Sequence, residues 1–339
     1  MVMSGADNTP TSIKPRKEPK MTHSFSKKEV IPIFFAVDDN YAKFLCVTLQ
    51  SLIENSSKEH DYEVNVLIDE LSESNINHIL EMQTDNVKIK FVSVTEKLRE
   101  ICQKLHLRDY YTKATYYRFF IPELFPMYDK GLYLDCDLAI TADVAELYHT
   151  KLGTNYVAAI PEEFITDVEV FGIYSEKILG VPRQEYFNAG ILVMNLDILR
   201  KEDLKGQFAD LLEKYTYRVA QDQDYLNVIC YGKSVILDKT WNRTPMPYAP
   251  LETPKIAHYK INFKPWKFDN IPYGDLFWKY AKNTRHYDEL LAEKNNYSEE
   301  NKLRDKNGYE GLVRLALSEI NEKEKEQKIF DNAMLFAVK

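Results

Sequence analysis

The stretch that decides the fold is GLYLDCD (131–137), in which a short apolar run ends in two acids. Apolar runs of this length are typical of strands buried in a sheet, and residues i and i+2 of a strand point to the same side. Asp135 and Asp137 therefore face the same way at the carboxyl end of the predicted strand. Two carboxylates so placed repel each other unless a cation lies between them. The pattern favours a metal site over a loop with two solvated acids.

Outward from this stretch, apolar runs of strand length alternate with segments of helical periodicity. The predicted strands are 30–37, 62–68, 87–94, 131–135 and 190–195, and the predicted helices are 41–53 and 71–82, the second capped by Ser72 or Ser74. This alternation predicts an α/β fold with a largely parallel sheet flanked by helices. Such sheets bind ligands at the carboxyl ends of their strands.

The two ends of the chain differ in composition from its middle. Residues 1–29 are rich in Lys, Ser, Thr and Pro and are predicted to be a disordered leader. Residues 283–339 form a charged, helix-favouring extension with one short apolar face: Leu312, Val313, Leu315, Ala316, Leu317 and Ile320. We expect this helix to pack on the domain or to mediate a homodimer. Peripheral membrane contact is the alternative, which the abundant glutamates disfavour.

Charge and cysteine usage narrow the class of protein. The net charge of -8 does not suit a general nucleic-acid binder, which needs a broad basic surface. The chain contains no C-x-x-C pair, so the simplest interpretation is free thiols in a reducing compartment at Cys46, Cys102, Cys136 and Cys230. With no run of about 20 apolar residues and no signal peptide, we expect a cytoplasmic protein, or one peripheral to the inner face of the membrane.

Five motifs occur in order along the chain: FFAVDDNY (34–41), DCD (135–137), YFNAGILVMNL (186–196), DQD (222–224) and HYKINFKPW (258–266). Together they resemble glycosyltransferase family 8 over about residues 30 to 280. Members of that family include bacterial lipopolysaccharide galactosyl- and glucosyltransferases and glycogenin. The resemblance implies a GT-A catalytic domain over 30–282 with a Rossmann-like, mostly parallel sheet. It also implies a UDP-sugar donor, Mn²⁺ and retention of the anomeric configuration.

A metal site is the first expectation that the resemblance carries. His258 ends the apolar strand KIAHY (255–259) and is assigned to the metal together with Asp135 and Asp137. An imidazole among oxygen ligands favours Mn²⁺, with Mg²⁺ as the alternative. Lys264 would pair with the diphosphate and help UDP leave. Many relatives carry Gly three residues after this His, where this chain has Ile261, so the backbone contact to phosphate and the loop shape are not carried over.

The nucleotide is expected at the end of the first strand. The resemblance assigns to it Ala36, Asp38, Asn40, Tyr41 and Cys136. From the residues themselves, Asp38 and Asn40 can hydrogen-bond a uracil edge and a ribose hydroxyl, and Tyr41 can stack on the base. The alternative is that Asp39 or Asn40 caps the following helix. Both roles are compatible.

The donor sugar is expected among Arg118, Asn188, Ala189, Gly190, Asp222 and Gln223. For Arg118 the alternative is one exposed Arg on an amphipathic helix, and for Asp222 it is an acid that favours a helix start. Gln223 would lie beneath the anomeric carbon and support oxocarbenium-like charge, because a glutamine is a feeble nucleophile. Glu162 is carried over as a residue near the acceptor and donor sugar.

The sequence therefore predicts a retaining, metal-dependent hexosyltransferase in cell-surface polysaccharide biosynthesis. It would transfer glucose or galactose from a UDP-sugar to a glycan, glycolipid or glycoprotein. The alternative is a non-catalytic scaffold or partner subunit with the same fold. A nucleotidyltransferase is disfavoured because DDNYAKF (38–44) contains no Gly-rich phosphate loop. Aromatic residues late in the chain line an acceptor groove or fill the core: Trp266, Phe268, Tyr273, Phe277 and Trp278.

Overall fold

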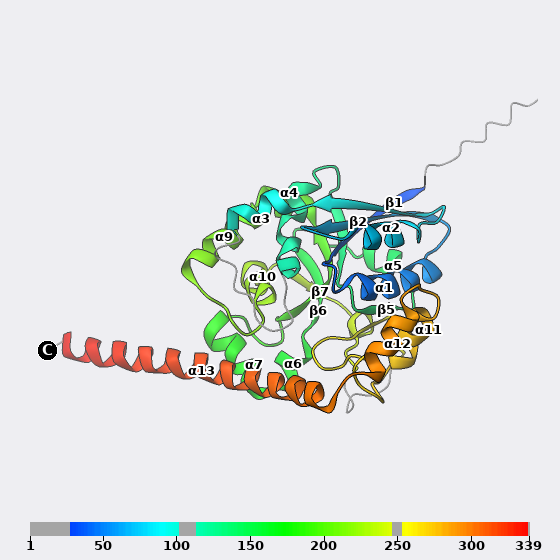
Figure 1. Ribbon diagram of the computed structural model, residues 1–339. Coiled ribbons are helices and arrows are strands. Elements are labelled where there is room, and N and C mark those ends of the chain that lie inside the picture. Colours follow the sequence, from blue (N-terminus) through cyan, green and yellow to red (C-terminus); the bar gives the residue numbers. More distant parts are fainter. Residues whose placement is uncertain (1–27, 102–112, 246–252, 338–339) are drawn as a thin grey trace, which may run out of the picture.

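The computed structural model describes residues 28–101, 113–245 and 253–337, so nearly all of the predicted leader lies outside the described residues. Its centre is a seven-stranded sheet in the order β3-β2-β1-β4-β7-β6-β8, beside a two-stranded sheet of β5 and β9 (Figure 1). The strands are β1 (Glu29–Ala36), β2 (His60–Ile68), β3 (Val87–Ser93), β4 (Lys130–Leu134), β5 (Leu138–Ile140), β6 (Val157–Pro161), β7 (Phe187–Asn195), β8 (Ser234–Ile236) and β9 (Ile256–His258).

The sheet is mostly parallel, as predicted. Strands β3, β2, β1 and β4 run parallel, whereas β7 runs antiparallel to both of its neighbours, β4 and β6. This reversal brings the amino end of β7 to the edge where β1 and β4 end. The two-stranded sheet pairs Leu138 with His258, which brings the late histidine to the residues that follow β4.

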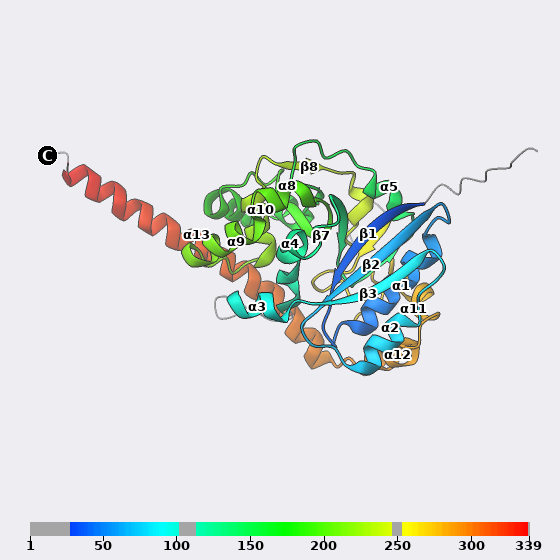
Figure 2. The same cartoon turned by 90° about the horizontal axis from the view of Figure 1, so that it is seen from above.

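Helices cover both faces of the sheet (Figure 2). They are α1 (Ala42–Asn55), α2 (Glu73–Leu80), α3 (Thr95–Ile101), η2 (Lys113–Phe120), α4 (Ile121–Leu124), α5 (Val144–Tyr148), α6 (Glu163–Asp167), α7 (Glu169–Tyr174), η3 (Ser175–Leu179), α8 (Leu196–Lys201), α9 (Leu204–Lys214), α10 (Asp222–Cys230), η4 (Lys239–Asn242), α11 (Gly274–Ala281), α12 (Tyr287–Asn295) and α13 (Glu299–Ala337). In β1, Ile33 and Phe35 belong to the core that includes α1, whereas Phe34 belongs to the core on the opposite face. Each such buried side chain contributes about 1.5–3 kcal/mol.

The turn between β1 and α1 differs from one sequence expectation. Asp39 and Asn40 do not cap α1, so that alternative is wrong. The helix begins after Tyr41, whose backbone N–H donates to the Asp38 carboxylate at 3.0 Å. Asp39 instead accepts from the backbone N–H of Ser72 at 2.9 Å, because the turn directs its carboxylate to the start of α2. Ser72 caps α2 with its side chain, as predicted.

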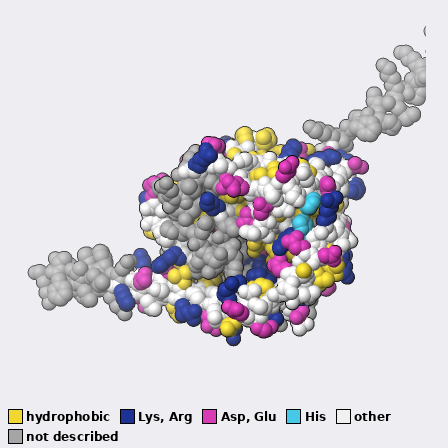
Figure 3. Space-filling model, in the orientation of Figure 1, with side chains coloured by type: hydrophobic (Ala, Val, Ile, Leu, Met, Phe, Trp, Pro, Cys, Tyr) yellow, Lys and Arg dark blue, Asp and Glu magenta, His cyan; other side chains and the backbone are white. Residues whose placement is uncertain are grey.

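The long helix α13 runs beside α6 and α7 and then extends beyond the body of the molecule (Figure 1). Ala316 and Ile320 are buried against the domain, which is the packing expected for this segment. Within the described ranges, no helix combines the length and apolar character needed to cross a membrane. Acidic and basic side chains are interspersed over the described surface of the face in Figure 3.

Candidate active site

A cleft opens at the edge of the sheet where β1 and β4 end and β7 begins. It is lined by these predicted site residues: Ala36, Asp38, Tyr41, Arg118, Asp135, Cys136, Asp137, Asn188, Ala189, Gly190, Asp222, Gln223, His258 and Lys264. Asn40 does not line this cleft. It borders a neighbouring hollow that shares Tyr41 and Lys264 with the cleft.

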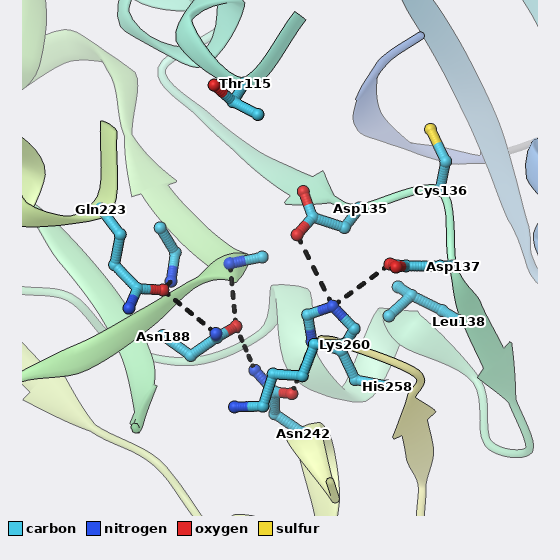
Figure 4. Close-up of polar contacts among 12 residues, drawn as sticks. Thr115, Asp135, Cys136, Asp137, Leu138, Asn188, Gln223, Asn242, His258 and Lys260 are labelled. Atoms are coloured by element: carbon cyan, nitrogen blue, oxygen red, sulfur yellow. Dashed lines mark hydrogen bonds and ion pairs between the residues drawn. The ribbon is translucent and has the colours of Figure 1, made fainter. Parts of the chain in front are cut away.

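Three potential metal ligands converge inside the cleft (Figure 4). The Oδ2 atom of Asp135 lies 3.6 Å from Nε2 of His258, and Oδ1 of Asp137 lies 3.2 Å from the same nitrogen. One ligand atom from each of the three residues lies within 4.8 Å of the others. Such separations suit a divalent cation, whose bonds to nitrogen and oxygen are about 2.0–2.2 Å long.

The atoms of the two carboxylates that face away from this centre are held by other side chains. Oδ1 of Asp135 accepts from the Tyr133 hydroxyl at 3.0 Å and from Nη2 of Arg118 at 3.2 Å. Oδ2 of Asp137 is paired with the Lys264 ammonium group. Each carboxylate thus keeps its inner oxygen free to bind a cation. Groups that orient metal ligands in this way raise metal affinity.

The imidazole of His258 is oriented in the same manner. Its Nδ1 atom lies 2.9 Å from Oδ1 of Asn242, which in turn donates from its amide to Asn188 at 2.8 Å. Because Asn242 donates through its NH₂ group, its oxygen is the acceptor, and Nδ1 of His258 carries the proton. The lone pair of Nε2 therefore faces the two aspartates, which is the tautomer that a metal requires. Asn242 has no local sequence signature and was missed by the sequence analysis.

Gly190 forms one wall of the candidate metal site. A Cβ atom at this position would lie 2.3 Å from Oδ2 of Asp135 and 2.5 Å from Cε1 of His258. Both distances are far below van der Waals contact. Only glycine leaves the space between these two ligands open.

The opposite charges of Asp137 and Lys264, at the candidate metal site, keep both side chains ionised. Burial raises the pKa of Asp137, but the charge of the neighbouring Lys264 ammonium group opposes this effect, and the pKa lies well below its usual range. Burial lowers the pKa of Lys264, and the Asp137 carboxylate reverses this and raises it.

Arg118 lies between two acids. Its Nε atom is 3.2 Å from Oδ2 of Asp222, and its Nη2 atom is 3.2 Å from Oδ1 of Asp135. Only 4% of its side chain is exposed, so the alternative of one exposed Arg on an amphipathic helix is wrong. Burial raises the pKa of Asp222 to about 7 although Arg118 opposes the shift. Arg118 shares its charge with Asp135, which explains why it does not restore the ordinary acidity of Asp222.

The amide groups of Asn188 and Gln223 belong to one buried network. The Asn188 amide donates to Glu162 at 2.6 Å and to the side-chain oxygen of Gln223 at 3.1 Å. The same Gln223 oxygen accepts the backbone N–H of Ala189 at 2.9 Å. Glu162 is also paired with Lys260. With two donors on its oxygen, the side chain of Gln223 is held in a fixed orientation beside the cleft.

The loop after His258 keeps a glycine-like conformation although it contains no glycine. Ile261 has a φ angle of 52°, in the left-handed region that β-branched residues rarely adopt. It also lines the cleft. Backbone strain of this kind persists where the surrounding structure fixes it, and it is concentrated at functional sites.

The five aromatic residues from Trp266 to Trp278 do not line this cleft. Trp266 and Phe277 are each 1% exposed and form a core cluster in which Trp266 stacks on Phe44 with ring centroids 4.2 Å apart. Of the two roles considered for these residues, core packing is therefore confirmed for Trp266 and Phe277.

Comparison with known proteins identifies relatives of this chain. The model of the family "Glycosyl transferase family 8" matches residues 32–270, which is more than half of the chain. A putative glycosyltransferase of Haemophilus influenzae is 30% identical over 64% of this chain and 64% of its own length. General stress protein A of Bacillus subtilis is 25% identical over 76% of this chain and 96% of its own length. The lipopolysaccharide 1,3-galactosyltransferase of Salmonella typhimurium is 28% identical, but the match spans only half of that protein.

Solved structures that resemble this chain are also glycosyltransferases. The galactosyltransferase LgtC, in complex with donor and acceptor sugar analogs, has a TM-score of 0.64 and 27% identity over 75% of this chain and 96% of LgtC. The bifunctional glycosyltransferase WbbM has a TM-score of 0.68 and 25% identity over 79% of this chain and 52% of WbbM. Family match, fold and the predicted order of motifs agree. The chain belongs to glycosyltransferase family 8 and has the GT-A fold of that family.

Proposed function

We propose that this protein is a retaining hexosyltransferase that moves glucose or galactose from a UDP-sugar to a glycan, glycolipid or glycoprotein. The observation that carries the proposal is the convergence of Asp135, Asp137 and His258 on one point of the cleft. The names of relatives support it, since LgtC is described with donor and acceptor sugar analogs and another relative as a lipopolysaccharide 1,2-glucosyltransferase. Cytoplasmic location, and contact of α13 with a membrane or a second copy, stay predictions.

The donor set fits a divalent cation, because the three inner ligand atoms face one another and their outer atoms are held by Arg118, Lys264 and Asn242. Asp135, Asp137 and His258 would hold Mn²⁺, with Mg²⁺ as the alternative. When bound there, the ion would act as a Lewis acid and make UDP a better leaving group. The Lys264 ammonium adds positive charge beside the same leaving group.

We assign the nucleotide to the end of β1. Ala36, Asp38 and Tyr41 line the cleft there, beside Cys136, whose thiol donates to the backbone oxygen of Ala36 at 3.2 Å. Asp38 would accept a hydrogen bond from the uracil or ribose, and Tyr41 would stack on the base. Asn40 would reach the nucleotide only from the neighbouring hollow that it borders.

The sugar-facing residues lie at the start of α10 and β7. We assign Asp222 to a donor-sugar hydroxyl and Arg118 to the ordering of Asp222 and Asp135. Gln223, held by Asn188 and Ala189, would support positive charge at the anomeric carbon. The acceptor oxygen bonds to that carbon from the face that the phosphate oxygen leaves, and its proton passes to the departing phosphate. The anomeric configuration is therefore retained.

The test is UDP release from a panel of UDP-sugars with Mn²⁺, followed by acceptor screening with the preferred donor. Asp137→Ala should abolish transfer, and a chelator should do the same to the wild type. Asp269→Ala is the matched control, because Asp269 is exposed and pairs only with Lys294 in the described contacts. Full activity of Asp137→Ala would refute the metal role. Binding of a UDP-sugar without hydrolysis or transfer would instead support the scaffold alternative.

A further inference from the structure

The cleft continues past the polar residues into an apolar end that the proposed function does not use. Side chains from four parts of the chain line this end: Phe164 and Ile165 of α6, Phe171 of α7, Val219 before α10, and Tyr309 and Leu312 of α13. We call these six residues the apolar wall. Tyr309 and Leu312 lie in the segment that the sequence predicts to be an extension outside the catalytic domain.

The part of α13 that enters the wall is fixed to the domain on both sides. Before Tyr309, the buried Asp305 carboxylate accepts from the Tyr297 hydroxyl at 2.6 Å and pairs with Lys267 at 3.2 Å. After Leu312, Ala316 is fully buried. Tyr309 and Leu312 are therefore held in place as part of the fold.

Aromatic rings form the centre of the wall. The Tyr309 ring lies 6.3 Å from that of Phe164 and 6.4 Å from that of Phe171. Phe164 and Phe171 are almost fully buried, whereas Tyr309 and Leu312 are half-buried and present apolar surface to the cleft. Such half-buried apolar surface in a cleft binds ligands through the hydrophobic effect.

The wall is continuous with the residues assigned to the sugar. Lys260, whose ammonium group pairs with Glu162, lies 5.6 Å from the centre of the Phe164 ring. Glu162 in turn accepts from the amide of Asn188. A ligand that occupies the sugar-binding part of the cleft can therefore extend directly onto the wall.

The chemistry of the wall indicates what that ligand carries. Ile165, Val219 and Leu312 have no side-chain hydrogen-bonding group, and a buried sugar hydroxyl without a partner is costly. We propose that the wall binds an apolar aglycone of the acceptor, so that the preferred acceptors are sugars linked to an alkyl or aryl group. This inference rests on the proposed function, because the polar end must hold the donor for the acceptor to lie beside it.

The experiment compares methyl glucoside with octyl glucoside below its micelle concentration. Calorimetry on the full chain, with and without UDP and Mn²⁺, should give an affinity for the octyl compound that is higher by at least about tenfold. Tyr309→Ala and Leu312→Ala should each remove most of this preference while leaving UDP affinity and acceptor-free hydrolysis of the UDP-sugar unchanged. Leu317→Ala is the matched control on the same helix, since Leu317 is 46% exposed and does not line the cleft.

Equal affinities for the two glucosides, or the same preference in Tyr309→Ala as in Leu317→Ala, would overturn the inference. Its failure can be told apart from failure of the proposed function. If UDP and Mn²⁺ do not bind but the octyl preference persists and depends on Tyr309, the donor assignment is wrong and the apolar wall is real. If UDP-sugar turnover occurs without any octyl preference, the proposed function stands and the wall has no such ligand.

Discussion

Two groups of histidine and acid side chains, at opposite edges of the same sheet, differ in how their ligand atoms are held. Within the described residues, Asp135, Asp137 and His258 form one group, and Glu29, His60 and His149 form the other. Glu29 and His60 are the first residues of β1 and β2, whereas Asp135 and Asp137 follow the last residue of β4. In both groups the ligand atoms lie within 4.8 Å of one another, so proximity alone does not separate them.

The two groups differ in burial and in the hydrogen bonds that hold their potential ligands from behind. The side chains of Glu29 and His149 are 47% and 48% exposed, and His149 Nε2 lies 2.9 Å from a Glu29 oxygen, as in an ordinary surface contact. By contrast, His258 is 3% exposed and its Nδ1 is fixed by Asn242. Ordered surroundings, more than the presence of ligand types, make the first group the better candidate for metal binding.

Filling the space between the ligands should have the largest effect. In Gly190→Ala the new Cβ would overlap Asp135 and His258, so both must shift. We expect transfer to fall at least about 100-fold, since a displacement of about 1 Å at a catalytic site has that cost. Mn²⁺ affinity, measured by electron paramagnetic resonance of the free ion, should fall as well.

The control for Gly190→Ala is Gly311→Ala, whose new Cβ would approach only the Arg314 guanidinium, at 3.9 Å. That change lies in a helix and should leave Mn²⁺ affinity unaltered. Normal Mn²⁺ affinity in Gly190→Ala would show that the ligands do not meet beside this glycine.

Removal of the side chain that orients the His258 imidazole should have the next largest effect, on Mn²⁺ affinity. Asn242→Ala removes the acceptor that orients His258 and leaves the ligands themselves in place. Loss of such an orienting partner lowers metal affinity about 10–100-fold. The measurement is a Mn²⁺ titration without any donor, with exposed Asn283→Ala as the control. An unchanged Mn²⁺ affinity would mean that proximity of the three ligands is sufficient, and the contrast between the two groups would lose its basis.

The pH dependence of stability tests the charge beside the metal site. The pKa of Asp222 is raised from 3.8 to about 7. Between these values the folded protein binds a proton that the unfolded chain has released, so stability falls as pH rises from about 4 to about 7 and levels off above 7. Asp222→Asn cannot release this proton, and its stability should decline less between pH 5 and 8, by on the order of 1 kcal/mol.

Thermal unfolding in the presence of a chelator measures this difference. Parallel pH profiles for the wild type and Asp222→Asn would show that Asp222 titrates normally in the folded state. The pH range matters, because below about pH 4 both folded and unfolded wild type carry the proton and the two proteins should then behave alike.

The sequence predicted the parts of this site that depend on local pattern. The strand before Asp135 and Asp137 is a short apolar run, and the side on which i and i+2 residues lie follows from strand geometry. The direction of β7 could not be predicted in this way, because a continuous apolar run has the same pattern in either direction. Ile261 was noted as a departure, but only the backbone shows that it keeps the left-handed conformation.

The positions of Asn242 and Tyr309 were not predicted, because they depend on contacts between segments that are distant in the sequence. Asn242 precedes His258 by 16 residues, and nothing in the sequence around it indicates that its side chain meets the imidazole. Tyr309 lies in a charged helix and outside the short apolar face predicted for it, yet its ring lines the cleft. Both placements depend on packing of elements that have no common local signature.

A substitution in the second group should have the smallest effect. It tests whether that group lacks a metal-binding role. His149→Gln removes one of its three potential ligands from an exposed position. Since surface substitutions of this kind usually change stability by less than about 0.5 kcal/mol, we expect unfolding, Mn²⁺ affinity and transfer to match the wild type. A lower Mn²⁺ stoichiometry in His149→Gln would show that this group also binds metal, and that burial and ordered second contacts are not required for a metal site in this fold.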